Sequence, residues 1–239
     1  MDLFSLITLA IGIFAGFYVQ SAMGFAGSLV ALPILLLKFQ LPEAIAYISL
    51  FYVFSSIFLI YREWVFIDKK TILDLSITSI VGVVLGILVL SFSKPIFLKR
   101  MLGAFILAYV LYSLLGKREL NLRNAGILGI GILAGFFSGV FSTGGPLYII
   151  CVENRVKKIN AIRATMIGIL GLVTLTRIPT LALSGILNIE QCKYAAIIFP
   201  IFLLAQFLGR KTFNISGKSH YKKSILFLLM LSGFSLLLR

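Results

Sequence analysis

The sequence is poor in the side chains that catalyse reactions and bind metals. Its 239 residues include one histidine, two cysteines and eight acidic residues. Cys151 and Cys192 lie far apart, without the short spacing of a metal site or a disulfide framework. We therefore expect no metal ion, no disulfide framework and no cofactor.

Charge of either sign is also scarce, because 13% of the residues are charged and 60% are hydrophobic. The uncharged runs are too long for an ordinary soluble core, and most match the ~20 residues that cross a hydrocarbon layer ~30 Å thick. Polar and apolar residues do not alternate with period two, which excludes a transmembrane β-barrel. We predict an all-α polytopic membrane protein with helices in the uncharged runs 3–37, 44–61, 75–93, 101–116, 124–152, 164–176, 178–189, 194–209 and 224–238.

The sequence lacks the features of a removable signal peptide. It begins with Met1 and Asp2, has no basic segment there and no small-residue cleavage site before the next apolar block. Its net charge of +14 is spread over short loops and helix ends. We interpret this charge as a topology signal for a protein in a lipid bilayer, and we expect no nucleic-acid partner.

An intramembrane hydrolase would need a nucleophile and a base inside the membrane. Ser138 and Ser142 are conceivable nucleophiles, but His220 lies between Lys218 and Lys222 in a predicted loop, and no lysine falls within a span. We therefore expect no catalytic residue and no enzyme activity.

The chain repeats itself at a nearly constant offset. Residues 12–17 (GIFAGF) return as residues 131–136 (GILAGF), an offset of 131 − 12 = 119. Ile67 and Asp68 precede an apolar run, as do Ile189 and Glu190, at an offset of 190 − 68 = 122. We interpret residues 1–120 and 121–239 as two membrane repeats of about four helical elements each. The alternative is that membrane helices resemble one another in Leu, Ile and Gly.

The first element of each repeat is interrupted. Residues 3–37 would form a helix of ~52 Å, which exceeds the thickness of the hydrocarbon layer. A break is predicted at 20–28, and the second repeat has a matching break at 138–146, where Gly permits positive φ and Pro146 suits the first turn of a new helix. Each element is therefore expected to consist of two half-helices joined by a Gly-rich turn.

The distribution of Lys and Arg favours a hairpin at each break. If the interrupted elements return to their starting side, the predicted loops fall into two groups. The loops at 61–70, 117–123, 153–163 and 209–223 share one side of the membrane and carry 15 Lys or Arg, and the loops at 38–43, 91–100 and 184–193 share the other side and carry 5. If each element crosses once, the split is 13 to 7. The positive-inside rule favours the first arrangement. It makes the repeats inverted, with both termini outside, as in transporters whose broken helices meet near the membrane midplane.

Such breaks predict a site for a small anion. The N–H groups at a half-helix N-terminus carry the positive end of the helix dipole, hydroxyls add neutral donors, and glycine lets a ligand approach the backbone. The alternative is that the small residues only allow close helix packing. The predicted substrate-binding residues at the breaks are Gln20, Ser21, Gly24, Gly27, Ser28, Ser138, Gly139, Ser142, Thr143, Gly144, Gly145 and Pro146.

Arg177 is a further candidate, because it interrupts the apolar stretch 164–189 about halfway along. A charge at the centre of a span costs ~2.5–3.5 kcal/mol on insertion scales, so we expect it to face protein or a water-filled cavity. Its guanidinium could hold an oxyanion with two hydrogen bonds. The alternative is that Arg177 snorkels to the interface or bonds to a backbone carbonyl.

At these breaks the chain resembles the TauE/SafE family of membrane transporters. The resemblance rests on the glycines of 135–139, on Thr143-Gly144-Gly145-Pro146-Leu147-Tyr148 and on Gly16, Gly24 and Gly27 leading to Pro33. It covers nearly the whole chain, although more glycine would be expected at 25–26 and 142–143. It implies a multi-pass protein of the bacterial cytoplasmic membrane that exports small sulfur-containing anions such as sulfite, sulfoacetate or other organosulfonates.

The prediction is therefore a secondary transporter whose partners are a small anionic substrate and the lipid bilayer. Broken helices also build pores, so an anion channel or a non-transporting membrane scaffold is the alternative. Rings of charge that would make a selectivity filter are missing from the sequence, which disfavours the channel.

Overall fold

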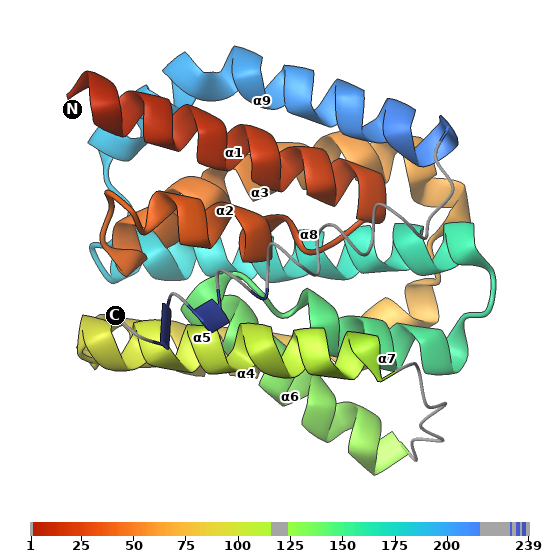
Figure 1. Ribbon diagram of the computed structural model, residues 1–239. Helices are drawn as coiled ribbons and strands as arrows, with labels where there is room; N and C mark the ends of the chain where they lie inside the picture. The colour runs from red at the N-terminus through yellow and green to blue at the C-terminus, as the bar shows by residue number, and fades with distance from the viewer. Residues whose placement is uncertain (1, 116–123, 216–229, 231–232, 235, 238–239) are drawn as a thin grey trace.

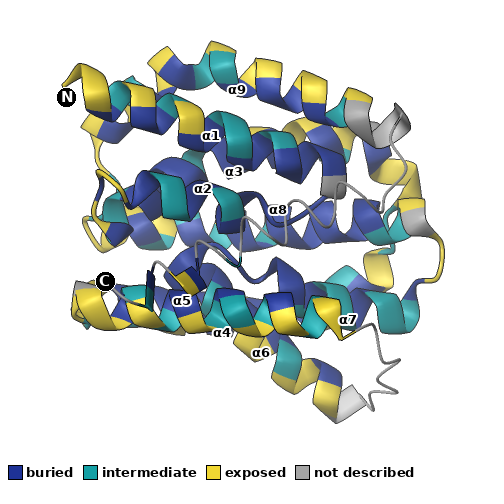
Figure 2. Cartoon of the chain, in the orientation of Figure 1, coloured by how far each residue is buried: buried dark blue, intermediate teal, exposed yellow. Residues whose placement is uncertain are grey.

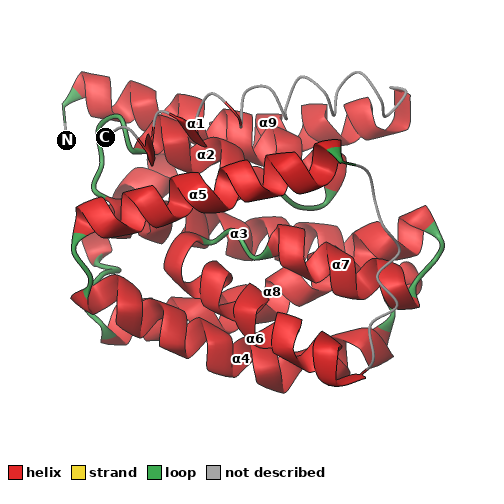
Figure 3. Ribbon diagram, turned by 60° about the horizontal axis from the view of Figure 1, so that its bottom comes forward, coloured by secondary structure: helices red, strands yellow, loops and turns green. Residues whose placement is uncertain are grey.

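The described part of the protein is helical. The computed structural model describes residues 2–115 and 124–215, with residues 230, 233–234 and 236–237, and no strand occurs among them. Figure 1 shows most helices side by side, and Figure 3 shows the loops at the two ends of the bundle. The elements are α1 (Leu3–Met23), α2 (Gly27–Leu35), α3 (Leu41–Glu63), the 3-10 helix η1 (Trp64–Phe66), α4 (Lys69–Phe92), α5 (Pro95–Leu114), α6 (Asn124–Phe141), α7 (Gly145–Arg155), α8 (Ile159–Leu183) and α9 (Ile189–Ile215).

The outer surface of the bundle is suited to lipid. Six helices, α1, α3, α4, α5, α8 and α9, are long and apolar enough to cross a membrane. Large apolar side chains point outward from them, among them Ile77 (73% exposed) and Phe207 (69% exposed), and Figure 2 shows exposed residues along the outward faces. Exposure of this surface to water would cost ~25 cal/mol per Å². The prediction of an all-α polytopic membrane protein is confirmed.

The first interrupted element is a hairpin. Gly24 ends α1 with φ +84° and donates its N–H to Gln20 O at 2.7 Å, and Ala26 precedes α2 with φ +70°. The chain then turns back, because Gly12 of α1 lies against Leu35 of α2. Lys38, just after α2, forms an ion pair of 3.2 Å with Asp2, just before α1. Both ends of the hairpin therefore lie at one end of the bundle.

The second interrupted element has the same form. Ser142 follows α6 with φ +57°, and Pro146 occupies the first turn of α7. The Sγ of Cys151 on α7 lies 3.9 Å from Ile127 O on α6, which places the end of α7 beside the start of α6. The hairpins agree with the arrangement that the charge count favours.

The helices within each hairpin are unequal, which differs from the expected pair of half-helices. At 1.5 Å per residue, the 21 residues of α1 span ~31 Å, enough to cross the bilayer, whereas the 9 residues of α2 span only ~13 Å. Likewise α6 has 18 residues and α7 has 11. Only α2 and α7 are therefore short helices that begin inside the bundle.

The loops gather at two ends of the bundle. Arg155 after α7 pairs with Asp74 of α4 at 2.5 Å, and Asp68 N donates to Thr165 Oγ1 at 2.9 Å, so the loops at 61–70 and 153–163 share one end. We call it the basic end. Figure 1 places the loops at 38–43, 91–100 and 184–193 at the opposite end. The predicted loop 117–123 and residues 216–223 lie outside the described residues.

Glycine allows helices to approach closely at the interface of α4 and α6. A Cβ atom on Gly135 would come within 2.9 Å of Ser79 Cα, and one on Gly139 within 3.0 Å of Gly86 Cα. In membranes, where no hydrophobic force drives helices together, such contacts supply packing energy. For Gly139, the structure therefore agrees with the alternative that the small residue allows close helix packing.

Helices from the first half of the chain pack against helices from the second half. The last described helix of the second half, α9, packs on α1, as α4 packs on α6, and α3 packs on α8. The repeated glycines nevertheless differ in their contacts, since Gly16 faces Gly27 and Ala31 of α2, whereas Gly135 faces α4. The division into repeats at 1–120 and 121–239, and their inversion, stay predictions.

We predict that Gly135→Leu lowers the free energy of unfolding of the purified protein by ~1–3 kcal/mol, because the new side chain would collide with the backbone of α4. Gly129→Leu, on the same helix, is the matched control, since nothing lies within 4 Å of a Cβ at Gly129. Thermal unfolding in detergent measures both. Equal midpoints for the two variants would contradict this account of the α4–α6 interface.

Candidate anion-binding site

The two hairpin turns meet inside the bundle. The Oγ of Ser28, in the first turn of α2, donates a hydrogen bond to the carbonyl oxygen of Ser142 in the second turn. A Cβ on Gly145 would lie 3.1 Å from Phe25 Cβ, so the residues that begin α7 also contact the first turn. The N-termini of α2 and α7 therefore approach each other in the protein interior.

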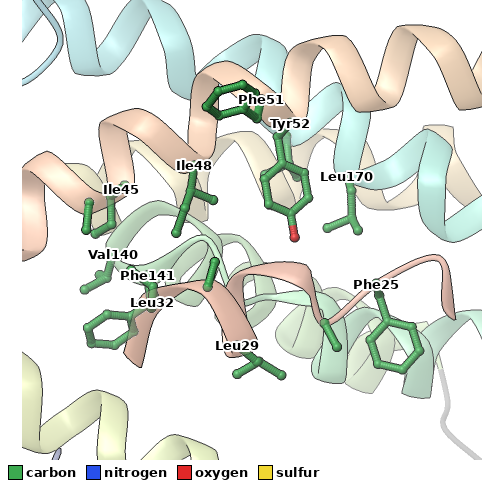
Figure 4. Close-up of a cluster of buried hydrophobic side chains, with 14 of the residues drawn as sticks. Phe25, Leu29, Leu32, Ile45, Ile48, Phe51, Tyr52, Val140, Phe141 and Leu170 are labelled. Carbon is green, nitrogen blue, oxygen red and sulfur yellow. The ribbon is translucent and has the colours of Figure 1, made fainter. Parts of the chain in front are cut away.

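Tyr52 of α3 completes the contact between the turns. The N–H of Ser28 donates to Tyr52 OH at 3.3 Å, and the Tyr52 hydroxyl lies 3.4 Å from Ser28 Oγ. Figure 4 shows the Tyr52 ring reaching from α3 toward α2, among the apolar side chains of Phe51, Leu29 and Leu170. The polar groups are thus enclosed by apolar ones, and water has little access to them.

Each short helix begins with backbone donors directed into this region. The first N–H groups of a helix have no acceptor within the helix, and together they carry about half a positive charge. At α7 the donors are Gly144 and Gly145, because Pro146 has no N–H. Two such ends in one place favour a bound anion.

Arg177 of α8 supplies a full positive charge. It is 2% exposed, so the alternative that it snorkels to the interface is wrong. One guanidinium nitrogen donates to Ser138 O at 3.0 Å, another to Thr174 Oγ1 at 3.4 Å, and its Nε has no partner. The guanidinium lies 5.5 Å from the centre of the Tyr52 ring. The carbonyl contact that the sequence left as an alternative is thus present, together with one free donor.

No carboxylate neutralises Arg177 among the ion pairs of the described residues. An uncompensated buried charge is costly, and such charges in membranes mark substrate or ion pathways. Arg177 lies nearer the end of α8 than the expected midpoint. Helical side chains point back toward the N-terminus, and this brings its guanidinium to the level of Tyr52, halfway along α3.

Two buried hydroxyl groups of the second turn, Ser142 Oγ and Thr143 Oγ1, have no hydrogen-bond partner among the described residues. A buried hydroxyl without a partner costs ~1–3 kcal/mol, and native proteins contain few. Each could donate to an oxyanion, because a hydroxyl hydrogen rotates freely. Nearby, the Tyr148 hydroxyl interacts with the hydroxyls of Ser79 and Ser138.

The other predicted residues divide between the meeting point and its surroundings. Gln20 lies against Gly27, where it supports the first hairpin. Ser21 bonds to Gln206 O of α9 at 2.7 Å, and Gly24 faces Arg163. Gly139 lies in the α4–α6 interface. The predicted residues that the structure brings together at the meeting point are Ser28, Ser138, Ser142, Thr143, Gly144, Gly145, Pro146 and Arg177.

Sequence reasoning missed the ion pair between Arg163 and Glu63. Both residues are buried, at 7% and 9% exposure. Arg163 is next to basic loop residues in the sequence, so it counted as a topology signal. The sequence contained one indication of its position. Arg163 and Arg177 are 14 residues apart, close to four helical turns, so on one helix they lie on the same face.

Comparison with known proteins identifies the family. The family model described as "Sulfite exporter TauE/SafE" matches residues 8–236. The chain belongs to the TauE/SafE family. It is similar to a probable sulfite/organosulfonate exporter TauE of Cupriavidus necator, with 28% identity over 204 residues that cover 82% of this chain and 80% of the relative. It is also similar to a probable membrane transporter protein of Methanocaldococcus jannaschii, with 30% identity over 221 residues, 83% of this chain and 81% of the relative. No solved structure matches the chain significantly.

Membership in the TauE/SafE family makes the protein a multi-pass membrane transporter, and it agrees with the predicted cytoplasmic membrane. The structure also gives a reason for the glycines that the resemblance leads one to expect at 25–26 and 142–143. Ala26 and Ser142 have positive φ, a conformation that costs an L-residue ~1–2 kcal/mol and costs glycine nothing.

We predict that Ser28→Ala destabilises the protein by ~1 kcal/mol, because it removes the hydrogen bond that joins the two turns. Ser49→Ala is the matched control. Ser49 is also fully buried on a helix, but its hydroxyl bonds only to Ile45 O of its own helix, at 2.6 Å. Chemical or thermal unfolding of both variants tests this. A loss as large in Ser49→Ala as in Ser28→Ala would count against a special role for the contact.

Proposed function

We propose that the protein transports small sulfur-containing oxyanions, sulfite or organosulfonates, and binds them where the two hairpin turns meet. The observation that carries this proposal is Arg177, a guanidinium buried to 2% exposure with no carboxylate partner among the described ion pairs. A transported anion would supply the missing negative charge.

The chemistry of the surrounding groups supports an oxyanion in particular. A sulfonate or sulfite group has several oxygens around one sulfur, and the planar fork of a guanidinium can donate to two of them at once. The free Nε of Arg177 and the unpartnered hydroxyls of Ser142 and Thr143 are donors of this kind. Hydroxyls can accept as well as donate, so the preference for an anion over a cation comes from the guanidinium and the backbone N–H groups, which only donate.

The names of the relatives support the sulfur-containing class. The Cupriavidus necator relative is called a probable sulfite/organosulfonate exporter, and the family description names sulfite export. A single Arg with hydroxyl and backbone donors suits one anionic group.

The rest of an organosulfonate would then need a different environment. We propose that the non-sulfonate part of a larger substrate lies among the apolar side chains that Figure 4 shows beside Tyr52.

We further propose that residues 1–120 and 121–239 act as inverted repeats that alternate in exposing this site to the two sides. Helix α2 runs from the site to the opposite end of the bundle and α7 runs from it to the basic end, so each half supplies one short helix. If the basic end faces the cytoplasm, as the positive-inside rule requires, outward movement of an anion gains ~2.3 kcal/mol per charge at 100 mV. Export would then need no second ion.

The test is thermal stabilisation of the purified full-length protein by sulfite, sulfoacetate, taurine and sulfate. At a concentration a hundred times its dissociation constant, a ligand stabilises the native state by ~2.7 kcal/mol. We predict that sulfite or sulfoacetate raises the unfolding midpoint of the native protein and that Arg177→Gln removes the shift while the variant still folds. Arg100→Gln, at an exposed arginine on α5, should keep it.

Transport in proteoliposomes separates the carrier from the alternative channel. A saturable flux of labelled sulfite that Arg177→Gln abolishes supports the proposal, whereas single-channel currents favour a pore. If none of the four ligands stabilises folded protein, or if Arg177→Gln transports normally, the assignment of this site is wrong.

A further inference from the structure

Buried polar side chains continue from Arg177 to the basic end along the interface of α3 and α8. The two helices are antiparallel, because Arg163 near the start of α8 pairs with Glu63 at the end of α3, whereas Arg177 lies beside Tyr52 in the middle of α3. Arg163 and Arg177 lie ~21 Å apart along α8 at 1.5 Å per residue. The row consists of polar residues that lie at or between these two levels and are less than 10% exposed. They are Tyr52, Ser55, Ser56 and Glu63 on α3 and Arg163, Thr165, Thr174 and Arg177 on α8.

Two amide side chains occupy the middle of this row. The Nε2 of Gln206 on α9 donates to Ser55 Oγ at 2.5 Å, and the Nε2 of Gln20 on α1 lies 3.5 Å from the same oxygen. The amide oxygens of both glutamines are buried and have no partner in the described structure. Side chains from three helices thus bring several unsatisfied polar groups together between Arg177 and Arg163.

Arg163 closes the row at the basic end. It forms a buried ion pair with Glu63, and its other terminal nitrogen donates to Ser21 O at 2.8 Å, just before the first hairpin turn. A Cβ on Gly24 would lie 2.8 Å from Arg163 Cγ, so the side chain rests on the turn itself. Arg163 therefore contacts the hairpin that supplies Ser28 to the site at Arg177.

A second cation lies beside this ion pair. Arg210 of α9 is within electrostatic range of Arg163, and one of its terminal nitrogens is buried without a described partner. The preceding residue, Gly209, packs against Ser21, with a would-be Cβ 3.0 Å from Ser21 Cβ. Glu63, Arg163 and Arg210, the charged residues that the structure describes here, together carry a net positive charge.

We propose that Arg163 is a second anion-binding residue for the substrate, at the basic end. In this proposal the Glu63 carboxylate pairs with Arg163 until a transported oxyanion displaces it. The proposal rests on the proposed function. A sulfonate or sulfite oxyanion can accept the same charge-assisted hydrogen bonds as a carboxylate. The exchange keeps Arg163 neutralised throughout, and its cost is that the Glu63 carboxylate loses its partner.

One cavity lies on the other side of Arg177. It has a volume of about 400 Å³, lies at the opposite end and is lined by Glu43, Tyr47, Asn188, Glu190 and Tyr194, among others. Tyr47 is about a turn and a half of α3 before Tyr52. This cavity and the Glu63–Arg163 ion pair therefore lie on opposite sides of Arg177 along the bundle. Breaking this ion pair by substrate would be the first step of entry from the basic end.

The test measures the sulfite concentration that gives half-maximal flux from each end, with labelled sulfite and with vesicles of both orientations. If Glu63 competes with the substrate, Glu63→Gln lowers the half-maximal concentration at the basic end about tenfold, and Arg163→Gln raises it about tenfold. Values measured from the opposite end should change less than twofold. Asp74→Asn is the matched control, since it removes an exposed ion pair with Arg155 at the same end.

A purely structural ion pair would behave differently. Its loss would lower the unfolding midpoint and the amount of active protein, with the half-maximal concentration unchanged. If Glu63→Gln does not fold, Glu63→Asp draws the carboxylate back from Arg163 and should lower the half-maximal concentration about threefold. Unchanged values at the basic end in the folded variants would overturn the assignment of Arg163, while flux that depends on Arg177 would still support the proposed function. Loss of that dependence would overturn both.

Discussion

The constraint on which this structure depends is that an interrupted helix can exist at membrane depth only where protein covers its free backbone groups. Lipid offers no hydrogen bonds, and each unsatisfied N–H or C=O costs several kcal/mol. Here the two interruptions cover each other. Ser28 donates to the carbonyl of Ser142, Tyr52 accepts from the N–H of Ser28, and the apolar faces of α3 and α8 surround the contact. The outer helices α4 and α9 then separate α6 and α1 from lipid on one side each.

The same arrangement determines how charge is distributed in the interior. The sequence has 22 basic and 8 acidic residues, so most cations in the protein have no acidic partner available. Charges at the ends of a membrane bundle can be solvated by water and by lipid headgroups. Inside, Arg163 has Glu63, whereas Arg177 has only carbonyl and hydroxyl oxygens. The two arginines on one helix therefore differ in that Arg163 has a carboxylate counter-ion and Arg177 has none among the described ion pairs.

Much of the fold follows from the sequence because its determinants are local. Run length gives the spans, Gly and Pro give the two breaks, and the distribution of Lys and Arg gives the hairpins. Arg177 and Ser142 were identifiable because a charge or a cluster of small polar residues is conspicuous in an apolar run. The unequal lengths of α1 and α2 were not predictable, since the position of a turn within an apolar run depends on which neighbours cover it. The ion pair of Glu63 and Arg163, which lie 100 residues apart in the chain, was not predictable for a different reason. Both residues lie beside predicted loops, where charged side chains are normally exposed. Only the tertiary contacts of α3 and α8 show that they are buried.

The arrangement of α2 and α7 also bears on how the proposed site would respond to a ligand. The N-termini of the two helices approach each other, and the Arg177 guanidinium contacts Ser138 and lies beside Tyr52 in the same region. Like charges in surroundings of low polarity repel one another. An anion bound where the two turns meet, as proposed, would offset the repulsion between these positive groups, and its release would favour separation of the turns.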